Sequence, residues 1–288
     1  MKRPLWSILL GISHGAADGT AGLLLLGLLQ GRSLIRPGEL VLIYNLLAFG
    51  AQPLVGALSD RWDKPRRAAI IGLAALGCAL PVAGWNEPLA VLLAGLGSAA
   101  FHTGGGAIAL CESPHESVGA GFFTAPGVFG LALGSALAVS GCTASWPWLL
   151  ALLICAVAVA LPALPAVPLK GQSQSGFDSS RDSFSLPELA LIALLIATVL
   201  RSTIWTSYQL LFAGQASSLL ILATSAAGGK LLGGLLADKF GWKRWGLGAL
   251  LAAALLLVVG QQNFVMLALG IGLLQSTTPL MLAAVGQV

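Results

Sequence analysis

The sequence predicts an all-α membrane protein with about ten transmembrane helices arranged in two bundles. Only 9% of the residues are charged, 57% are hydrophobic and the mean hydropathy is +0.89. A soluble domain carries about 25% charged residues, so this chain has too few of them to cover a surface that faces water. A bilayer core of about 30 Å needs about 20 apolar residues per helix, and runs of this length follow one another along the chain.

These apolar runs fall into two groups, separated by residues 170–188, which are rich in Ser, Gln and Asp and have the composition of a linker. We therefore predict a six-helix N-terminal bundle in residues 1–169, a linker in 170–188 and a partial bundle of four helices in 189–288. The eighth run contains Lys230, and the ninth is short. The predicted spans are Leu5–Leu29, Leu40–Leu58, Ala68–Trp85, Pro88–Cys111, Val118–Ser140, Trp146–Leu169, Leu189–Leu211, Ala216–Ala237, Trp245–Gly260 and Phe264–Val285.

The basic residues predict the orientation of these spans, because loops rich in Lys and Arg stay in the cytoplasm. An inner-membrane location with a cytoplasmic N-terminus and a cytoplasmic linker places most of the 15 basic residues on one side. The opposite loops then hold only Arg32 and Arg36, while Arg201 and Lys230 lie inside spans. The residues placed in the cytoplasm are Lys2, Arg3, Arg61, Lys64, Arg66, Arg67, Lys170, Arg181, Lys239, Lys243 and Arg244.

Several classes of function are excluded by the motifs that the sequence lacks. It contains no phosphate-binding loop and no HExxH, so we expect neither an enzyme nor a transporter driven by ATP. The four cysteines have no CxxC or histidine spacing, and we expect no metal site and no cofactor. The net charge of +4 is explained by membrane topology, and nucleic acid is not an expected partner.

Two loops of the predicted cytoplasmic face repeat one pattern: a glycine, three residues, an aspartate, a basic residue and then further basic residues. One copy is Gly56-Ala-Leu-Ser-Asp60-Arg61-Trp-Asp63-Lys64-Pro-Arg66-Arg67, and the other is Gly234-Leu-Leu-Ala-Asp238-Lys239-Phe-Gly241-Trp-Lys243-Arg244. One repeat in each half is typical of transporters. An aspartate beside a neighbouring helix terminus can hold one conformation and release it in another, so we predict gating loops; the alternative is chance similarity between two basic loops.

On these residues the chain resembles the major facilitator superfamily, whose G-x-L-a-D-r-x-G-r-[KR] loop recurs after spans two and eight. The N-terminal copy departs from that pattern because Asp63 stands where glycine usually does. The segments Ser13-His14 and Gly97-Ser-Ala-Ala-Phe101-His102-Thr-Gly104-Gly105 are similar to those of fosmidomycin-resistance-like exporters. The resemblance implies a twelve-span transporter of two bundles, of which the last two spans are missing here.

Two further departures concern spans four and five. Span four lacks the arginine common in proton-coupled members. Span five carries Gly127-Val-Phe-Gly130-Leu-Ala-Leu-Gly134-Ser135, which is glycine-rich like an antiporter motif but has no Gly-Pro step. Its glycines serve either antiport or close helix packing.

Ionisable residues inside a membrane are costly and mark functional sites. Asp18 lies near the middle of span one with His14 four residues earlier on the same face, and His102 lies near the middle of span four. In the family fold both spans line the cavity, so the three residues are predicted to form a proton-binding cluster. The alternative is a structural hydrogen bond between the two helices.

Two cations inside spans are candidates for substrate binding. Arg201 either meets an anionic substrate group, pairs with Asp18, or extends to the outer interface beside aromatic residues. Lys230 lies eight residues before Asp238, about 12 Å deeper along the helix. It binds substrate, pairs with Glu112 or extends back to the interface.

These features predict a secondary transporter that exports small or drug-like molecules in exchange for protons by alternating access. Its expected partners are the substrate, protons and the lipid bilayer, together with a second copy or a partner subunit that covers the incomplete second bundle. Two alternatives stay open: a non-transporting scaffold derived from the family, and a truncated fragment of a twelve-span transporter.

Overall fold

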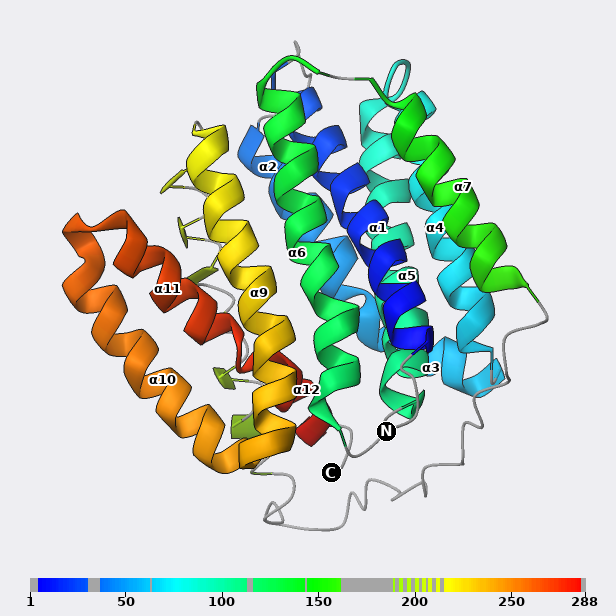
Figure 1. Ribbon diagram of the computed structural model, residues 1–288. Coiled ribbons are helices and arrows are strands. Elements are labelled where there is room, and N and C mark those ends of the chain that lie inside the picture. The colour runs from blue at the N-terminus through cyan, green and yellow to red at the C-terminus, as the bar shows by residue number, and fades with distance from the viewer. Residues whose placement is uncertain are drawn as a thin grey trace.

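A computed structural model describes residues 5–30, 37–62, 64–112, 116–142, 144–161 and 215–285. Between them it describes residues 189, 192–193, 196–197, 200–201, 204–205, 207–208 and 211–212. The described residues form helices and no strand (Figure 1). Eight of these helices are long and apolar enough to cross a membrane, so the predicted all-α membrane fold is confirmed.

The N-terminal part matches the predicted spans closely. The second span is assembled from three consecutive segments, because the π-helix η1 lies between α2 and α3. The sixth is described only as far as Leu161, so the remainder of the predicted run to Leu169 lies outside the described residues. The elements are α1 (Leu5–Gln30), α2 (Pro37–Asn45), η1 (Leu46–Gly50), α3 (Gln52–Trp62), α4 (Pro65–Val82), α5 (Glu87–Glu112), α6 (Ser117–Val139) and α7 (Trp146–Ala160).

In the C-terminal part, the last predicted span is confirmed as one apolar span over Phe264–Ala284, but its helix is interrupted. Instead of one helix over Phe264–Val285, the structure has two, separated at Ser276 and Thr277. Pro279 has no N–H to donate to the turn before it, and both break residues turn their hydroxyls back onto backbone carbonyls. The elements are α9 (Ala216–Phe240), α10 (Trp242–Val259), η2 (Gly260–Gln262), α11 (Phe264–Gln275) and α12 (Thr278–Val285).

Two other predicted spans have different outcomes. Lys230 does not interrupt α9, which continues through it to Phe240. The span predicted over 189–211 is described at scattered positions only, of which Arg201 and Trp205 are helical and buried.

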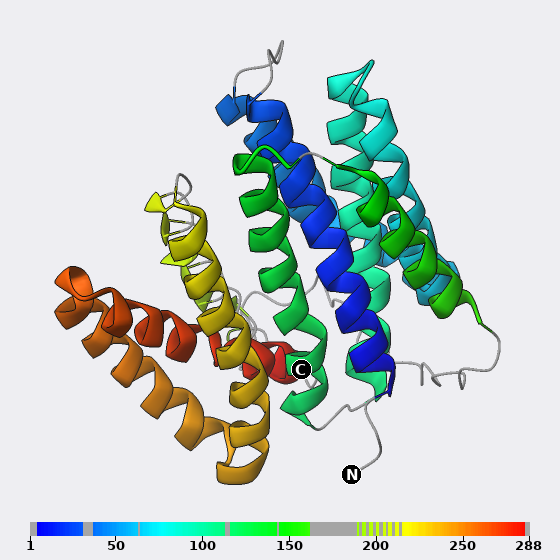
Figure 2. The same ribbon diagram turned by 45° about the horizontal axis from the view of Figure 1, so that its top comes forward.

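Close packing of α1 against α6 depends on glycines that face each other. The carbonyl of Gly15 lies against Gly130 and the carbonyl of Gly19 lies against Gly134, so a methyl group at either α6 position would collide with the α1 backbone. The two helices lie side by side in both ribbon views (Figures 1 and 2). Gly130 and Gly134 of the fifth predicted span therefore serve close helix packing.

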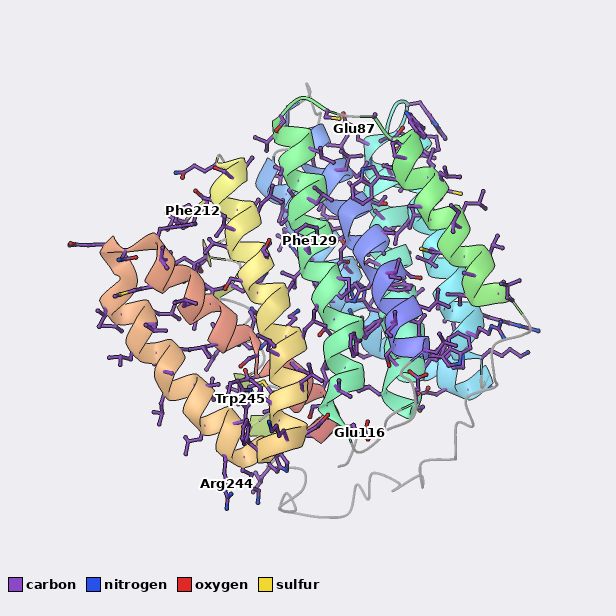
Figure 3. All side chains as sticks on the ribbon, in the orientation of Figure 1. Glu87, Glu116, Phe129, Phe212, Arg244 and Trp245 are labelled. Carbon is purple, nitrogen blue, oxygen red and sulfur yellow. The ribbon has the colours of Figure 1, made fainter. Side chains whose placement is uncertain are left out.

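Large apolar side chains cover much of the exterior (Figure 3). Leu54 is 77% exposed, and Leu251 and Val258 on α10 are 65% and 68% exposed. Such a surface suits lipid rather than water, which agrees with a multi-pass membrane protein. That a second copy or a partner covers the second bundle stays a prediction.

Both repeated loops lie at the same end of the molecule, which we call the basic end. The α3–α4 and α9–α10 connections both lie there, on opposite sides of the molecule (Figure 1), and Arg244 lies at this end while Glu87 lies at the other (Figure 3). Gly241 has φ +89°, which turns the chain from α9 into α10 and requires glycine. Asp63, its counterpart in the first copy, lies outside the described residues.

Candidate functional site

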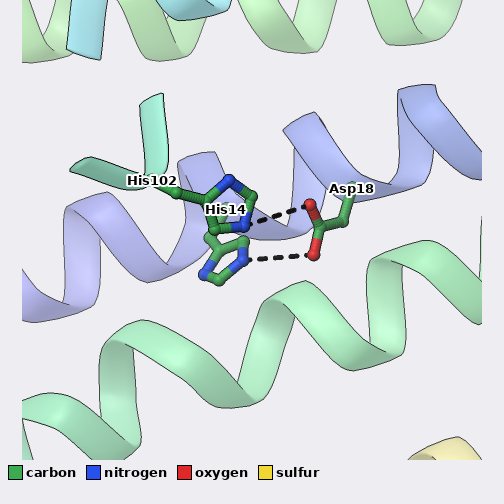
Figure 4. A group of neighbouring side chains, drawn as sticks. All are labelled: His14, Asp18 and His102. Atoms are coloured by element: carbon green, nitrogen blue, oxygen red, sulfur yellow. Dashed lines mark ion pairs between the residues drawn. The ribbon is translucent and has the colours of Figure 1, made fainter. Parts of the chain in front are cut away.

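A histidine–aspartate cluster joins α1 to α5. Nε2 of His14 lies 3.1 Å from Oδ2 of Asp18, and Nε2 of His102 lies 3.6 Å from Oδ1 (Figure 4). The two imidazole rings are edge to face with centroids 4.5 Å apart. The exposed fractions are low, 7%, 18% and 16% for the side chains of His14, Asp18 and His102. The structure thus brings together the three residues predicted to form a midplane cluster.

Backbone carbonyls fix which nitrogen of each ring carries hydrogen. Nδ1 of His14 lies 2.9 Å from the carbonyl of Phe123, and Nδ1 of His102 lies 2.7 Å from the carbonyl of Ser98. A carbonyl can only accept, so each Nδ1 donates. In the neutral rings both Nε2 atoms are therefore acceptors, and both point at the Asp18 carboxylate.

Three converging acceptors repel one another unless a cation lies among them. A proton on either Nε2 satisfies this requirement, because it turns a lone-pair contact into a charge-assisted hydrogen bond to Asp18. One side-chain nitrogen or oxygen atom from each of His14, Asp18 and His102 lies within 4.8 Å of the other two, so the three residues could hold a metal ion. We expected no metal site from the sequence, because spacing along the chain does not place His102, on a different helix, beside His14 and Asp18.

The surroundings hold the His14 ring in place. It packs against the rings of Phe101 and Phe123, with centroids 5.9 Å and 4.7 Å away. Gly127 leaves the space that the ring occupies, since a methyl group there would collide with the imidazole. The ring has little freedom to turn its Nε2 away from Asp18.

A hydroxyl chain extends the cluster towards α2. The Tyr44 hydroxyl donates to Oγ of Ser98 at 3.3 Å, and that Oγ lies 3.2 Å from Nδ1 of His102. Ser98 was not among the candidates from sequence, because a serine inside an apolar helix is usually explained by packing. Its position one turn before His102 was the available signal.

Lys230 lies on α9 and is 8% exposed. Its Nζ is 3.5 Å from the carbonyl of Thr124 on α6, and it lies close enough to Asp18 to interact electrostatically. It neither extends to the interface nor pairs with Glu112. The Glu112 carboxylate instead accepts hydrogen bonds from the backbone N–H groups of Trp6 and Ser7 at the start of α1, both at 2.8 Å.

Arg201 is also 8% exposed, so it does not extend to the outer interface as one interpretation held. Its Nη1 donates to Oε1 of Gln275 and to Oγ1 of Thr278, both at 2.7 Å. These residues flank the break between α11 and α12. Among the described residues, Arg201 therefore contacts neutral partners beside α11 and α12, and it forms no hydrogen bond or ion pair with Asp18.

At the basic end, Asp238 lies at the N-terminus of α6. Its two carboxylate oxygens accept from the backbone N–H of Ser117 at 2.7 Å and of Val118 at 2.9 Å. An anion at a helix N-terminus is favourable because the first N–H groups have no partner within the helix. Gly234 allows this approach, since a methyl group there would lie 2.8 Å from the Ser117 carbonyl. This contact joins α9 to the start of α6.

The other gating candidates occupy the surface of the basic end. A Cβ added at Gly56 would lie 4.0 Å from the methyl group of Thr103 on α5. Asp60, Arg61 and Lys64 are exposed. In the second copy Lys239 lies 5.3 Å over the ring of Phe240 and Lys243 5.3 Å over that of Trp242, and Arg244 is exposed.

Arg66 forms a contact at the basic end that sequence reasoning missed. Its Nε donates to the Val159 carbonyl at 2.6 Å and its Nη2 to the Leu161 carbonyl, at the end of α7. Its guanidinium also lies 5.4 Å over the Trp6 ring. From the sequence, Arg66 was used only as one of the basic residues that predict the membrane orientation.

Neither a protein-family profile nor a curated protein sequence matches the chain. Its structure is similar to that of FucP, a major facilitator superfamily transporter, in the outward conformation, with TM-score 0.69, 14% identity and coverage of 98% of this chain and 83% of that one. It is also similar to a single-residue variant of the E. coli fucose:proton symporter FucP, with TM-score 0.63, 19% identity and coverage of 98% and 86%.

The chain has the major facilitator fold. Both similar structures are transporters. These similarities do not show whether the chain belongs to a fosmidomycin-resistance-like subgroup, and they do not show whether it exports its substrate.

Proposed function

We propose that this protein is a proton-coupled secondary transporter that moves small molecules across the membrane by alternating access. The observation that carries the proposal is the cluster of His14, Asp18 and His102, in which two Nε2 acceptors face one carboxylate. Histidine changes its charge near neutral pH, so the cluster is suited to gain and lose a proton under physiological gradients. The major facilitator fold supplies two bundles that can rock about a buried site.

Asp18 and Lys230 give a route from proton binding to movement of the bundles. Asp18 is on α1 of the first bundle and Lys230 is on α9 of the second, and the two interact electrostatically. A proton on the Asp18 cluster weakens this attraction across the boundary. The bundles then separate more easily on that side, which is the differential interaction that a conformational change requires.

The Asp238 contact provides the gate at the basic end. In the present conformation it joins α9 to the N-terminus of α6 by two charge-assisted hydrogen bonds. Opening the basic end requires these bonds to break. We propose that this end is cytoplasmic, which follows the positive-inside rule.

We also propose the direction expected from the sequence, efflux of small or drug-like molecules in exchange for protons. Its support is the resemblance of Ser13-His14 and of the segment around His102 to exporters. The similar FucP is named a symporter, so the direction of the proton is the point that an experiment must decide.

The test is a proton-flux measurement on the purified protein in liposomes that contain a pH-sensitive dye. A panel of small drug-like compounds is added outside in the absence of a pH gradient. We expect some compounds to drive proton movement, with internal alkalinisation for exchange and internal acidification for symport. Flux should vanish in Asp18→Asn and persist in Glu39→Gln, which removes an exposed carboxylate at the start of α2. A transport-inactive protein, as the scaffold alternative requires, would move no proton with any compound.

A further inference from the structure

The charges inside the membrane helices do not balance. The predicted spans hold one aspartate away from their ends, Asp18, and two cations, Arg201 and Lys230. Both cations are buried in the structure. With neutral histidines this leaves one excess positive charge in a medium where an unpaired charge costs several kcal/mol. A buried, unbalanced cation is retained in a membrane protein when it binds an anionic group.

Arg201 has an unused donor. Its Nη1 is occupied by the neutral oxygens of Gln275 and Thr278, while its Nε is buried and, among the described residues, has no hydrogen-bond partner. A buried donor without an acceptor is destabilising. The Nε–H of Arg201 is therefore available to an acceptor that the described part of the chain does not supply.

The break between α11 and α12 adds to the positive electrostatic potential around Arg201. Thr278, the first residue of α12, is one of the two partners of Arg201. Broken membrane helices direct the N-termini of their second halves at the anionic groups of transported substrates. Gln275, Ser276, Thr277 and Thr278 are all buried here, which gives the break a polar lining inside the bundle.

Lys230 approaches the same region from α9. Its nearest described hydrogen-bond partner is the Thr124 carbonyl at the long distance of 3.5 Å. It interacts electrostatically with Arg201 as well as with Asp18. The two cations therefore lie near enough to repel each other, and one anion between them would relieve that repulsion.

We infer that the transported substrate is a small organic anion with one net negative charge, a carboxylate bound by Arg201 and Lys230. One negative charge balances the one excess positive charge, and a carboxylate oxygen can accept from the free Nε–H of Arg201. This inference rests on the proposed transport function and names its substrate class. The neutral amide of the same compound lacks the charge and should bind poorly.

The experiment measures melting temperature for the purified full-length protein in detergent. The probes are acetate, butyrate, hexanoate and benzoate, each paired with its amide, together with sulfate and inorganic phosphate. We expect at least one carboxylate to raise the melting temperature while its amide does not. Arg201→Gln and Lys230→Gln should each weaken the apparent affinity about ten- to hundredfold, the loss typical of one charge-assisted hydrogen bond. Arg67→Gln, the same change at an exposed arginine, should bind like the wild type.

Three results would overturn the inference: equal stabilisation by an acid and its amide, unchanged affinity in Arg201→Gln, or stabilisation by sulfate or phosphate and by no carboxylate. If Arg201→Gln fails to fold, Arg201→Lys keeps the charge and should still bind, though more weakly, and the acid–amide comparison needs no variant. Transport of the same compound in liposomes separates the two claims. A carboxylate that binds through Arg201 but is not transported supports the anion site and refutes the transport function. Proton-coupled movement of neutral or cationic compounds alone supports the transport function and refutes the anion site.

Discussion

The Nε2 atom of His102 on α5 lies 3.6 Å from Oδ1 of Asp18 on α1, and the carbonyl of Ser98 fixes the hydrogen of that histidine on its other nitrogen. The helix pair thus presents an acceptor to a carboxylate inside the membrane. A proton is the smallest species that makes this contact favourable. The predictions below follow from that arrangement and from the contacts around it.

Replacing His102 with Gln should alter how transport depends on pH. The amide cannot take a proton, so the cluster loses one of its two titratable partners of Asp18. We expect the pH dependence of proton-driven flux to become less steep, with only a small change in folding stability. Ser98→Ala is the matched control, because it removes a hydroxyl that touches His102 but keeps the carbonyl that orients it. A histidine variant with the wild-type pH profile would show that His102 is only structural.

Proton and carboxylate binding should support each other. Asp18 and a bound anion both interact with Lys230, so protonation of the cluster removes a competitor for that ammonium. The charged and titratable groups that face Asp18 are His14 and His102, Lys230 and the nearby Tyr44. We expect carboxylate affinity, measured by thermal shift, to rise as pH falls, and to lose this dependence in Asp18→Asn. Cooperative binding would assign carboxylates to symport with a proton and not to the exchange proposed above, whereas an affinity that falls as the pH falls would support exchange.

Removing the Asp238 charge should weaken the closed basic end. Asp238→Asn replaces one of the two accepting oxygens by an NH2 group that cannot accept, so one of the hydrogen bonds from Ser117 and Val118 is lost and the other loses its charge assistance, at a cost of about 1–3 kcal/mol. We expect a lower melting temperature and a slower transport cycle. Asp60→Asn, the equivalent change in the first loop, should affect stability less because Asp60 is exposed. Equal effects of the two changes would mean that the α6 N-terminus contact is not the gate.

Methyl groups between α1 and α6 should be strongly destabilising. In Gly130→Ala the new methyl meets the Gly15 backbone, and overpacking of this kind costs about 1–3 kcal/mol. Gly228→Ala is the control, since nothing lies within 4 Å of its added Cβ in α9 and alanine favours a helix by about 1 kcal/mol. In detergent, we expect a melting temperature below that of the wild type for Gly130→Ala and above it for Gly228→Ala. Similar melting temperatures would contradict the close packing of these helices.

The sequence predicted most of the fold because membrane helices depend on local composition. Apolar runs gave helix positions such as Leu5–Gln30 to within one residue. The break at Ser276 was missed because its run is uniformly apolar up to Gln275, and the hydroxyl-to-carbonyl bonds that favour it are visible only in three dimensions. Pro279 was the one local signal for it.

The site was partly predictable for a similar reason. Asp18 and the histidines stood out because charge is rare inside spans, and the family resemblance placed their helices together. The partners of Arg201 and Lys230 could not be predicted, since they depend on how α9, α11 and α12 pack. Sequence allowed an interfacial position for both cations, whereas the folded chain buries them.

The central claim is that Asp18 couples transport to a proton, and the most direct measurement compares two modes of transport in Asp18→Asn. The protein is reconstituted into liposomes with a compound that the proton-flux screen shows to be transported. Counterflow exchange of labelled for unlabelled compound needs no net proton movement, while transport driven by an imposed pH gradient does. We predict that Asp18→Asn retains exchange and loses gradient-driven transport. Gradient-driven transport at the wild-type level in Asp18→Asn would contradict the account.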